Sequence, residues 1–296
     1  MSSGLFLLRE RILIAVLGRT RFLSSRIASS VWFWHRLGYW PKLDPPRTFN
    51  EKILFRKLYD RNELFGVLCD KLAVREFVRE RVGNEYLPVV FQVVSDPADF
   101  DLDALPESFA LKANHGWSQC VLVPSKREFS LDDHSVRMRR WLAHHHGQKR
   151  WALEWAYSQV EPKLYAEELL HGEGGAPPWD YKFYVFGGRV VYVHVDIDRF
   201  GDQRRCFYDR NWQPLEIHGK VQLGEPGPRP ARLDEMIKAA EALGRDLDFV
   251  RVDLYDVPDV GVKFGEMTLY PGAGVARFDS RDWELRFGSH WNQSVQ

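Results

Sequence analysis

The sequence predicts an α+β fold, with helices in the first third of the chain and antiparallel hairpins in the last third. Helical periodicity is strong up to about Val82, and the Gly187-Gly188 turn then separates two runs of β-type residues. The segment from Phe249 to Gly274 also reads as two strands, joined by a Pro/Asp/Gly turn. Strands and helices do not alternate regularly, which disfavours a parallel sheet.

The N-terminal segment, residues 1–45, is predicted to be a helical and aromatic extension. Its apolar run from Leu5 to Leu17 is interrupted by charged residues and is too short to span a bilayer. A basic helix followed by the aromatic stretch Val31–Trp40 could lie on an anionic membrane surface. The alternative is a helix that packs against the rest of the protein.

A second helical stretch is predicted from Phe49 to Val82, with a division near Asn62–Leu64. Thr48 is a candidate N-cap, and Glu51 three residues later completes a capping-box pattern. The elements expected after it are a buried strand over Leu87–Val94, strands over Phe109–Lys112 and Cys120–Val123, a helix over Ser130–His146 and a strand over Lys163–Leu170.

A hairpin is predicted from Tyr181–Phe186 and Arg189–Asp198. The second strand alternates, so Tyr192, His194 and Asp196 are expected to face outward while the valines face inward. An amphipathic helix over Arg232–Leu243, with Gly244 as its stop, precedes the final hairpin.

The final hairpin carries two acids that could bind a metal. With a turn over Asp256–Gly261, Asp253 is expected opposite Phe264 and diagonal to Glu266 on one face. Two carboxylates at that distance repel unless a cation or proton lies between them, and Mg²⁺ prefers such oxygen ligands. Arg251 adds a positive charge suited to a phosphoryl group. The alternative is a solvated hairpin face.

Composition and missing motifs narrow the function. The 41 basic and 41 acidic residues balance, which argues against binding of nucleic acid through net charge. The three cysteines are far apart, which indicates neither a zinc site nor a disulfide framework and suggests a reducing cytoplasm. No Rossmann, P-loop, zincin or nucleophile-elbow motif is present. Lys112, entering the turn NHGWSQ, could hold nucleotide phosphates, although a plain surface hairpin explains it too.

Several segments in order resemble the ATP-grasp ligases, and most closely their TupA-like branch, which is associated with polysaccharide assembly. The segments are RTFNEKILFRKLYDR (47–61), DKLAVREFV (70–78), LPESFALKANHG (105–116), PKLYAEELL (162–170), DYKFYVFGGR (180–189), VRVDLY (250–255) and FGEMTLYPGAG (264–274). The last hairpin is also similar to that of D-alanine–D-alanine ligases. The resemblance implies two lobes of antiparallel sheet plus helices that clasp ATP.

On this resemblance, residues 46–110 form an N-terminal helical and strand lobe, 111–170 the small lobe, and 171–296 the C-terminal lobe with the Mg²⁺ site. The resemblance also implies an ATP-binding set, which is Lys71, Lys112, His115, Gly116, Trp117, Ser118, Glu167, Glu168, Leu169, Leu170, Asp180 and Lys182. In it, Lys71 and Lys112 are the nucleotide lysines, 114–118 the phosphate loop and 167–170 the adenine hinge. Trp117 makes that loop bulkier than in most relatives.

The resemblance implies that Arg251 and Lys112 are catalytic and that Asp253, Glu266 and Thr268 bind Mg²⁺. Thr268 replaces an asparagine that is usual in the wider superfamily. Arg199, Arg204, Pro271 and Gly272 are implied to contact the acceptor substrate.

The implied reaction is an ATP- and Mg²⁺-dependent carboxylate–amine ligation through an acylphosphate, on a uronic acid or similar carboxylate of a cell-surface polysaccharide. The partners are ATP, a carboxylate and an amine or amino acid, with no nucleic acid. The expected location is the cytoplasm, with possible contact at the inner face of the membrane. The alternatives are a kinase for a sugar hydroxyl, a non-catalytic scaffold that keeps the fold, and a glycosyltransferase, whose nucleotide sugar fits the pattern less well than ATP.

Overall fold

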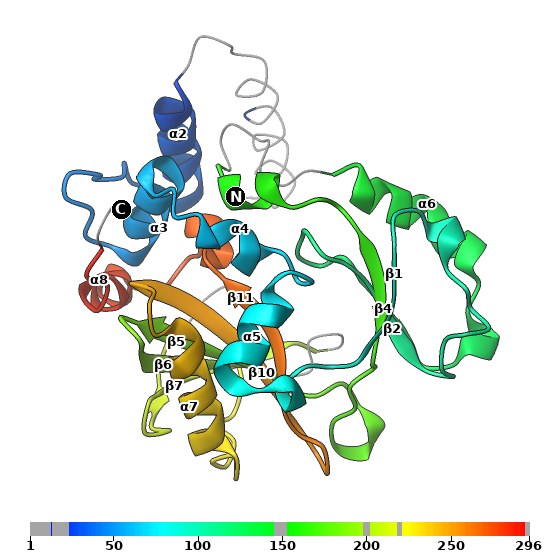
Figure 1. Ribbon diagram of the computed structural model, residues 1–296. Coiled ribbons are helices and arrows are strands. Elements are labelled where there is room, and N and C mark those ends of the chain that lie inside the picture. The colour runs from blue at the N-terminus through cyan, green and yellow to red at the C-terminus, as the bar shows by residue number, and fades with distance from the viewer. Residues whose placement is uncertain (1–12, 14–23, 145–152, 198–201, 218–220, 294–296) are drawn as a thin grey trace.

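A computed structural model describes residues 13, 24–144, 153–197, 202–217 and 221–293. Within these residues the strands form two sheets, and the mixed helix and antiparallel-sheet architecture confirms the α+β prediction (Figure 1). Sheet A has the order β1-β4-β2-β3, and sheet B has the order β11-β10-β5-β6-β7-β8, with β9 parallel to β7. Sheet A consists of β1 (Val90–Val94), β2 (Phe109–Ala113), β3 (Cys120–Val123) and β4 (Leu164–Glu167). Sheet B consists of β5 (Asp180–Phe186), β6 (Arg189–Ile197), β7 (Arg204–Asp209), β8 (Pro214–Leu215), β9 (Gln222–Leu223), β10 (Phe249–Val257) and β11 (Gly261–Thr268).

The helices of the first third follow the sequence pattern closely. The Thr48 hydroxyl accepts a hydrogen bond from the Glu51 backbone N–H, and the Glu51 carboxylate accepts one from the Thr48 N–H, so the predicted capping box is formed. The stretch divides near Asn62, as predicted, and again at Asp70–Ala73, which the sequence did not indicate. The helices are α2 (Ser25–Leu37), α3 (Phe49–Tyr59), α4 (Leu64–Cys69), α5 (Val74–Val82), α6 (Leu131–Leu142), α7 (Leu233–Gly244) and α8 (Arg281–Ser289).

Helix α6 covers one face of sheet A. Met138 and Trp141 of α6 pack in one apolar cluster with side chains of β2, β3 and β4. The predicted buried strand over Leu87–Val94 is in fact the edge strand β1, whose Val93 is 48% exposed. The prediction was wrong because an apolar run shows that a segment is β-type and not where in the sheet it lies. The sheet takes strands from both sides of the domain boundary expected at residue 110.

Sheet B has both faces covered, but by different kinds of contact. Helix α7 packs on one face, where a Cβ added to Gly244 would lie 2.6 Å from Val185, so this glycine permits close packing. The aromatic part of the other face lies under α3 and α8, where Tyr192 stacks on Phe287 with ring centroids 4.1 Å apart. Phe49 of α3 packs against the same group of rings. The remaining part of this face is polar.

Arg56 of α3 fixes the helical layer to the two strands of the final hairpin. Its guanidinium is fully buried and donates to the backbone oxygens of Phe249 at 2.9 Å and Leu269 at 3.3 Å. It also forms an ion pair with Asp248 and lies 3.5 Å from Asp60. Since the bonded carbonyls lie at the start of β10 and just after β11, this arginine determines where those strands sit below α3.

In the described part of the chain, no helix combines the length and apolar character needed to cross a bilayer.

Replacing Arg56 by methionine is expected to lower the free energy of unfolding by about 3 kcal/mol or more, because Asp248 and Asp60 would lose their buried partner. Urea-induced unfolding measures this change. Arg79→Gln is the matched control, since Arg79 pairs with Glu76 on an exposed surface, and such pairs contribute about 0.5 kcal/mol. Equal losses in the two variants would contradict the structural role of Arg56.

Candidate active site

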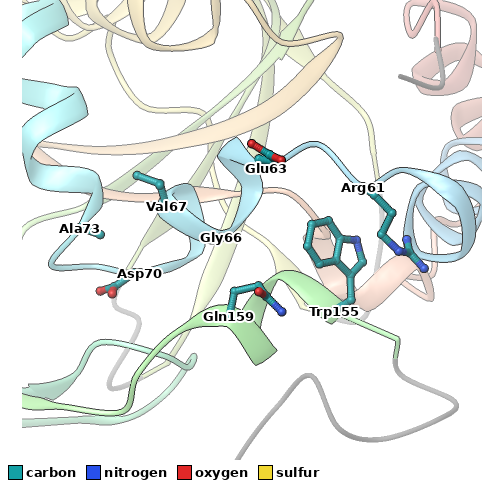
Figure 2. A pocket seen from close by; sticks show the side chains of 8 residues that line it. All are labelled: Arg61, Glu63, Gly66, Val67, Asp70, Ala73, Trp155 and Gln159. Atoms are coloured by element: carbon teal, nitrogen blue, oxygen red, sulfur yellow. The ribbon is translucent and has the colours of Figure 1, made fainter.

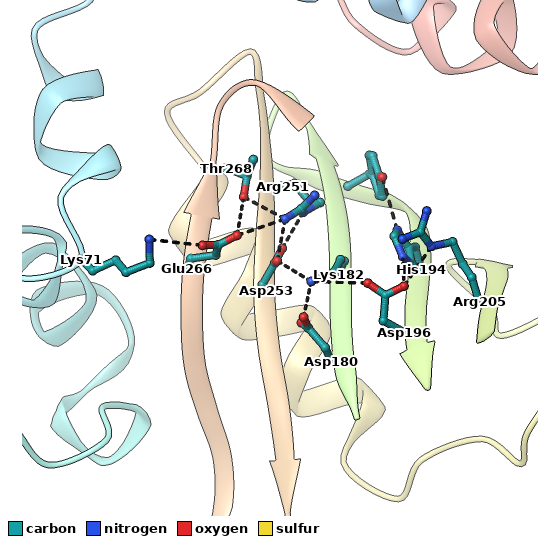
Figure 3. Close-up of polar contacts among 11 residues, drawn as sticks. Lys71, Asp180, Lys182, His194, Asp196, Arg205, Arg251, Asp253, Glu266 and Thr268 are labelled. Atoms are coloured by element: carbon teal, nitrogen blue, oxygen red, sulfur yellow. Dashed lines mark hydrogen bonds and ion pairs between the residues drawn. The ribbon is translucent and has the colours of Figure 1, made fainter. Parts of the chain in front are cut away.

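A charged row of side chains, which includes Lys182, Arg251, Asp253 and Glu266, runs across the polar part of sheet B (Figure 3). Lys182 on β5 is the register partner of Asp253 on β10, which in turn lies opposite Glu266 on β11. Directly opposed residues of antiparallel strands share a face, so the three side chains point the same way. Arg251 and Thr268 form the next register pair on the same face of these two strands. The structure therefore brings together the residues predicted to bind Mg²⁺ and the phosphoryl group.

A β-bulge at Gly265 sets this arrangement and corrects the predicted register. Leu254 pairs with Phe264, but Asp253 pairs with Glu266, so β11 has one extra residue between them. Without the bulge Asp253 would oppose Gly265, and Glu266 would point to the other face of the sheet. The expected pairing of Asp253 with Phe264 was therefore wrong by two residues. One comes from the turn, because Val257 pairs with Gly261 and Leu254 with Phe264, and the other comes from the bulge. A Cβ at Gly265 would lie only 3.1 Å from the Asp253 carbonyl oxygen.

Arg251 lies between the two acids. Its Nε and Nη2 donate to the two oxygens of Asp253 at 2.6 and 2.7 Å, and Nη2 also donates to Glu266 at 3.2 Å and Thr268 at 2.9 Å. The Lys182 amine donates to Asp253 Oδ2 at 2.7 Å, the oxygen that also accepts from Arg251 Nη2. The repulsion expected between Asp253 and Glu266 is therefore relieved within the protein.

Burial and the neighbouring carboxylates together shift the pKa values of Arg251 and Lys182. Burial lowers the pKa of Arg251, but Asp253 more than offsets this and leaves the pKa of the guanidinium raised. Burial lowers the pKa of Lys182 as well, and Asp180 and Asp253 together leave it raised. Both cations are thus held in their charged form beside Asp253, whose side chain is only 2% exposed.

Lys71 connects this row to sheet A. It lies in the turn between α4 and α5, where its backbone N–H donates to Asn114 O at 3.0 Å. Its amine donates to Gly116 O at 2.5 Å and lies 3.6 Å from a Glu266 oxygen. One lysine therefore joins the predicted phosphate loop to the predicted metal ligand.

Lys112 lies on β2 and forms an ion pair with Glu167 at the end of β4. Burial lowers its pKa, but Glu167, and to a smaller extent Glu266, raise it above the ordinary value. Asn114, two residues after Lys112, accepts the backbone hydrogen bond of Lys71 at 3.0 Å, so the segments that carry the two predicted nucleotide lysines are in contact.

The predicted phosphate loop has a rigid start and an exposed tip. Asn114 is buried and donates to Asp70 and to Glu161 O, both at 3.0 Å. The His115 ring is buried, with its Nε2 2.9 Å from Trp141 O in α6, so the ring itself is held against that helix. Trp117 is 60% exposed, and Ser118 has φ 57°, in the left-handed region.

The predicted adenine hinge follows β4. The Glu168 backbone N–H donates to Val89 O at 2.8 Å, and its carboxylate accepts from the Val89 N–H at 3.1 Å, which ties the hinge to the start of β1. Leu169 and Leu170 are half-buried. The Glu167 carboxylate is engaged with Lys112, so the apolar leucines are the hinge side chains suited to a base.

The charged row extends beyond Lys182 to residues that sequence reasoning did not identify. Asp196 on β6 lies 3.9 Å from the Lys182 amine and accepts hydrogen bonds from His194 at 3.0 Å and Arg205 at 2.9 Å. Burial, followed by the charge of Arg205, lowers the pKa of His194 to about 3, so this ring is neutral. His194 and Asp196 were predicted to face outward, but both are buried, since the His194 ring packs between Tyr184 and Phe207. Asp180 ion-pairs with Lys182.

Three of the four predicted acceptor residues lie in the described part of the chain. Arg199 lies outside the described residues. Arg204 points to the opposite face of β7 from Arg205 and pairs with Asp202 at 3.0 Å. Pro271 and Gly272 begin a tight turn after β11, which is held to α3 by a 2.9 Å hydrogen bond from Lys57 to Ala273 O.

A pocket of about 460 Å³ lies on the outer side of α4 (Figure 2). Trp155, Gln159, Arg61 and Asp70 are among its lining residues, and none of the charged row lines it. The Asp70 oxygen Oδ1 already accepts from the Leu72 backbone N–H at 2.8 Å and from Asn114. The pocket is therefore separate from the charged row.

The donor set of the row fits Mg²⁺. Among the described residues no group of three or more His, Cys, Asp or Glu side chains converges as a metal site. Mg²⁺, however, commonly takes one or two carboxylates and completes its shell with phosphate oxygens and water. Asp253 and Glu266 supply two carboxylates, and the Thr268 hydroxyl lies 3.2 Å from Glu266. Glu266 is 31% exposed and is the accessible member.

A family model described as TupA-like ATPgrasp matches residues 51–291. The chain belongs to the TupA-like ATP-grasp family. Its two antiparallel sheets with flanking helices are therefore the two lobes of an ATP-grasp fold. None of the curated proteins matches the sequence significantly.

Solved ATP-grasp ligases resemble this TupA-like chain at low identity. A D-alanine–D-alanine ligase from Bacillus anthracis, complexed with ATP, is 17% identical with a TM-score of 0.42, over 71% of this chain and 58% of that one. The ligase PsnB, complexed with a minimal precursor, Mg and ADP, is 14% identical with a TM-score of 0.40, over 82% and 66%. An L-amino acid ligase from Bacillus licheniformis is 14% identical with a TM-score of 0.41, over 76% and 46%. The chain thus spans little more than half the length of the D-alanine–D-alanine ligase.

The two predicted metal ligands should differ in their effect on stability. Asp253→Asn leaves Arg251 and Lys182 without their shared buried partner, so we expect a loss of about 3 kcal/mol in the free energy of unfolding. Glu266→Gln removes a partly exposed charge and should cost less than about 1 kcal/mol. Urea unfolding without Mg²⁺ or nucleotide measures both. If Asp253→Asn were neutral or stabilising, repulsion between the acids would be the dominant effect instead.

Gly265→Ala tests the bulge. The added Cβ would crowd the Asp253 carbonyl and the Tyr255 ring and shift Glu266 relative to Asp253. We expect a higher Mg²⁺ concentration for half-maximal thermal stabilisation by Mg·ATP, with an unchanged circular dichroism spectrum. Gly227→Ala is the matched control, because a Cβ there meets only an ordinary 3.5 Å contact with Trp179. An unaltered Mg²⁺ midpoint in Gly265→Ala would show that the bulge does not control metal binding.

Proposed function

We propose that the protein is an ATP- and Mg²⁺-dependent ligase that joins a carboxylate to an amine through an acylphosphate. The observation that carries the proposal is the position of Lys71, which lies 3.6 Å from Glu266 beside Arg251 and whose backbone N–H bonds to Asn114 in the loop that follows Lys112. The TupA-like family assignment supports the same chemistry. Residues 46–110, 111–170 and 171–296 are proposed as the lobes that contribute the helical layer, the nucleotide loop and the metal site.

Each residue has a separate role in this proposal. Lys71 and Lys112 bind phosphate oxygens, and Leu169 and Leu170 contact the base beside the backbone of 167–170. Asp253, Glu266 and Thr268 hold Mg²⁺, which would neutralise charge on the β- and γ-phosphates. Arg251 stabilises the transferred phosphoryl group, and Lys182 keeps Asp253 in position. Pro271 and Gly272 line the acceptor side.

The bond changes balance in two steps. An oxygen of the substrate carboxylate attacks the γ-phosphorus, and the bond to the β–γ bridging oxygen breaks, which releases ADP. The amine nitrogen then attacks the acyl carbon, and phosphate leaves with the bonding electron pair while the nitrogen loses a proton. Water must be kept from the acylphosphate, because hydrolysis would waste the ATP. Trp117 at the exposed tip of the loop is suited to cover the nucleotide.

The proposed carboxylate is a uronic acid or similar sugar acid of a polysaccharide or its precursor, processed in the cytoplasm. Contact with the inner face of the membrane is proposed through the N-terminal segment. The side chains of Ile27, Trp34 and Trp40 there are 45%, 53% and 58% exposed. Aromatic side chains beside basic residues such as Arg26 and Arg36 favour a membrane–water interface.

The proposal is tested by ADP release from a panel of uronic acids combined with amino acids, with mass detection of the amide. We expect release above background only when carboxylate, amine and Mg²⁺ are all present. Glu266→Gln should abolish turnover because it removes the accessible metal carboxylate.

Two outcomes would contradict the ligase assignment. Release that depends on a sugar hydroxyl and yields a phosphorylated sugar would make the protein a kinase. No release with any pair, together with unchanged biological function in Glu266→Gln, would make it a scaffold. Glu216→Gln is a suitable control variant, since Glu216 lies on the surface and is not part of the charged row.

A further inference from the structure

The charged row of sheet B has two accessible ends and a buried middle. Side-chain exposure is 2% for Asp253, 6% for Lys182 and 4% for Asp196. It rises to 31% for Glu266 on β11 and to 29% for Arg205 on β7. The Glu266 end is the proposed metal and phosphate end. The Arg205 end is cationic, and the proposed reaction has not yet given it a role.

Arg205 is held in a geometry suited to an anion. Its Nε donates to Asp196 Oδ1 at 2.9 Å, and Asp196 is fixed in turn by His194 at 3.0 Å. His194 is itself sandwiched between Tyr184 and Phe207, with ring centroids at 6.3 and 4.9 Å. Within the described ranges, the terminal nitrogens Nη1 and Nη2 of Arg205 have no protein acceptor. A guanidinium anchored through Nε presents these two nitrogens as a fork that matches a carboxylate.

The position of Arg205 indicates which carboxylate it receives. Arg205 reaches Asp253 only through two other side chains: its Nε lies 2.9 Å from Asp196, Asp196 lies 3.9 Å from the Lys182 amine, and that amine lies 2.7 Å from Asp253. A carboxylate bound at the outer nitrogens of Arg205 is therefore separated from Asp253 and Glu266 by Asp196 and Lys182, and it is not the one that is phosphorylated. It belongs to the molecule that approaches the acylphosphate from the side away from the metal, which is the amine.

We propose that Arg205 binds the carboxylate of the amine substrate, so that the amine substrate is an amino acid. This inference rests on the proposed ligase function. Asp196 and His194 are positioning residues that hold the guanidinium, and Arg205 makes the contact. The nearby Lys182 does not compete for the same anion, because Asp180 and Asp253 already neutralise it.

The first test is binding, which does not require turnover. Saturation-transfer NMR on pools of L- and D-amino acids, with Mg²⁺ and a non-hydrolysable ATP analogue, identifies a binder. The binder is then compared with its carboxamide. We expect the wild type to bind the acid and not the amide, and Arg205→Gln to lose the signal. Arg229→Gln should retain it, because Arg229 is an exposed arginine that pairs with Asp234 at 2.6 Å, away from the charged row.

The second test is kinetic and uses ADP release with the amino acid so identified. Arg205→Gln should raise its KM about tenfold to a hundredfold, the range for losing a hydrogen bond to a charged group, with a smaller change in kcat. Arg205→Lys should recover part of this loss, since it restores the charge but not the fork. Circular dichroism and the melting temperature show whether each variant is folded.

The outcomes separate this inference from the ligase assignment. Binding of an amino acid that depends on Arg205, without any amide product, would support the site and overturn the ligase reaction. Amide formation with equal KM for the amino acid and its carboxamide, or an unchanged KM in Arg205→Gln, would overturn the Arg205 assignment while leaving the ligase intact. No binding of any amino acid would also overturn it.

Discussion

The sharing of one buried carboxylate, Asp253, between Arg251 and Lys182 is the interaction on which the charged row depends. Removing ions from water costs several kcal/mol each, and only close, well-oriented partners offset that cost. Asp253 accepts from both cations at 2.6 to 2.7 Å. Because the pairing is satisfied internally, the row is fixed before any ligand arrives, as phosphoryl transfer requires of the groups that position and neutralise.

The helices around sheet B leave one part of one sheet face polar. Helix α7 covers the opposite face, and α3 and α8 cover only the aromatic part of the face that carries the row. Arg56 connects α3 to the carbonyls at the start of β10 and after β11. The helical layer therefore fixes the position of the final hairpin, and this hairpin carries Asp253 and Glu266.

The sequence predicted local structure well and the environment of each face poorly. The capping box at Thr48 and the hairpin at Gly187–Gly188 are determined by neighbouring residues, and both are formed. The bulge at Gly265 depends on a single insertion that periodicity does not reveal, so the predicted partner of Asp253 was two residues off, although Asp253 and Glu266 were correctly expected on one face. His194 and Asp196 alternate as outward residues should, but His194 is buried between Tyr184 and Phe207, and Asp196 is buried among His194, Lys182 and Arg205. Arg205 lies beside Asp196 only because β7 pairs with β6, a pairing that the sequence pattern does not predict.

The charge balance of the site suggests how nucleotide could bind without leaving a buried ion unpaired. Lys71 lies 3.6 Å from Glu266, and Lys112 pairs with Glu167. A metal bound to Glu266 would take over the partner of Lys71, whose amine would then be free to bind the phosphates that the same metal brings. The metal cation would thus replace the lysine cation beside Glu266, and phosphate oxygens would replace the carboxylate beside Lys71. No buried charge would lose its partner, so the net cost of desolvation would stay small. Asp253 would need no such exchange, since its cations remain in place and its oxygens have further lone pairs to offer. On this argument the exposed ends of the row change partners while its buried middle does not.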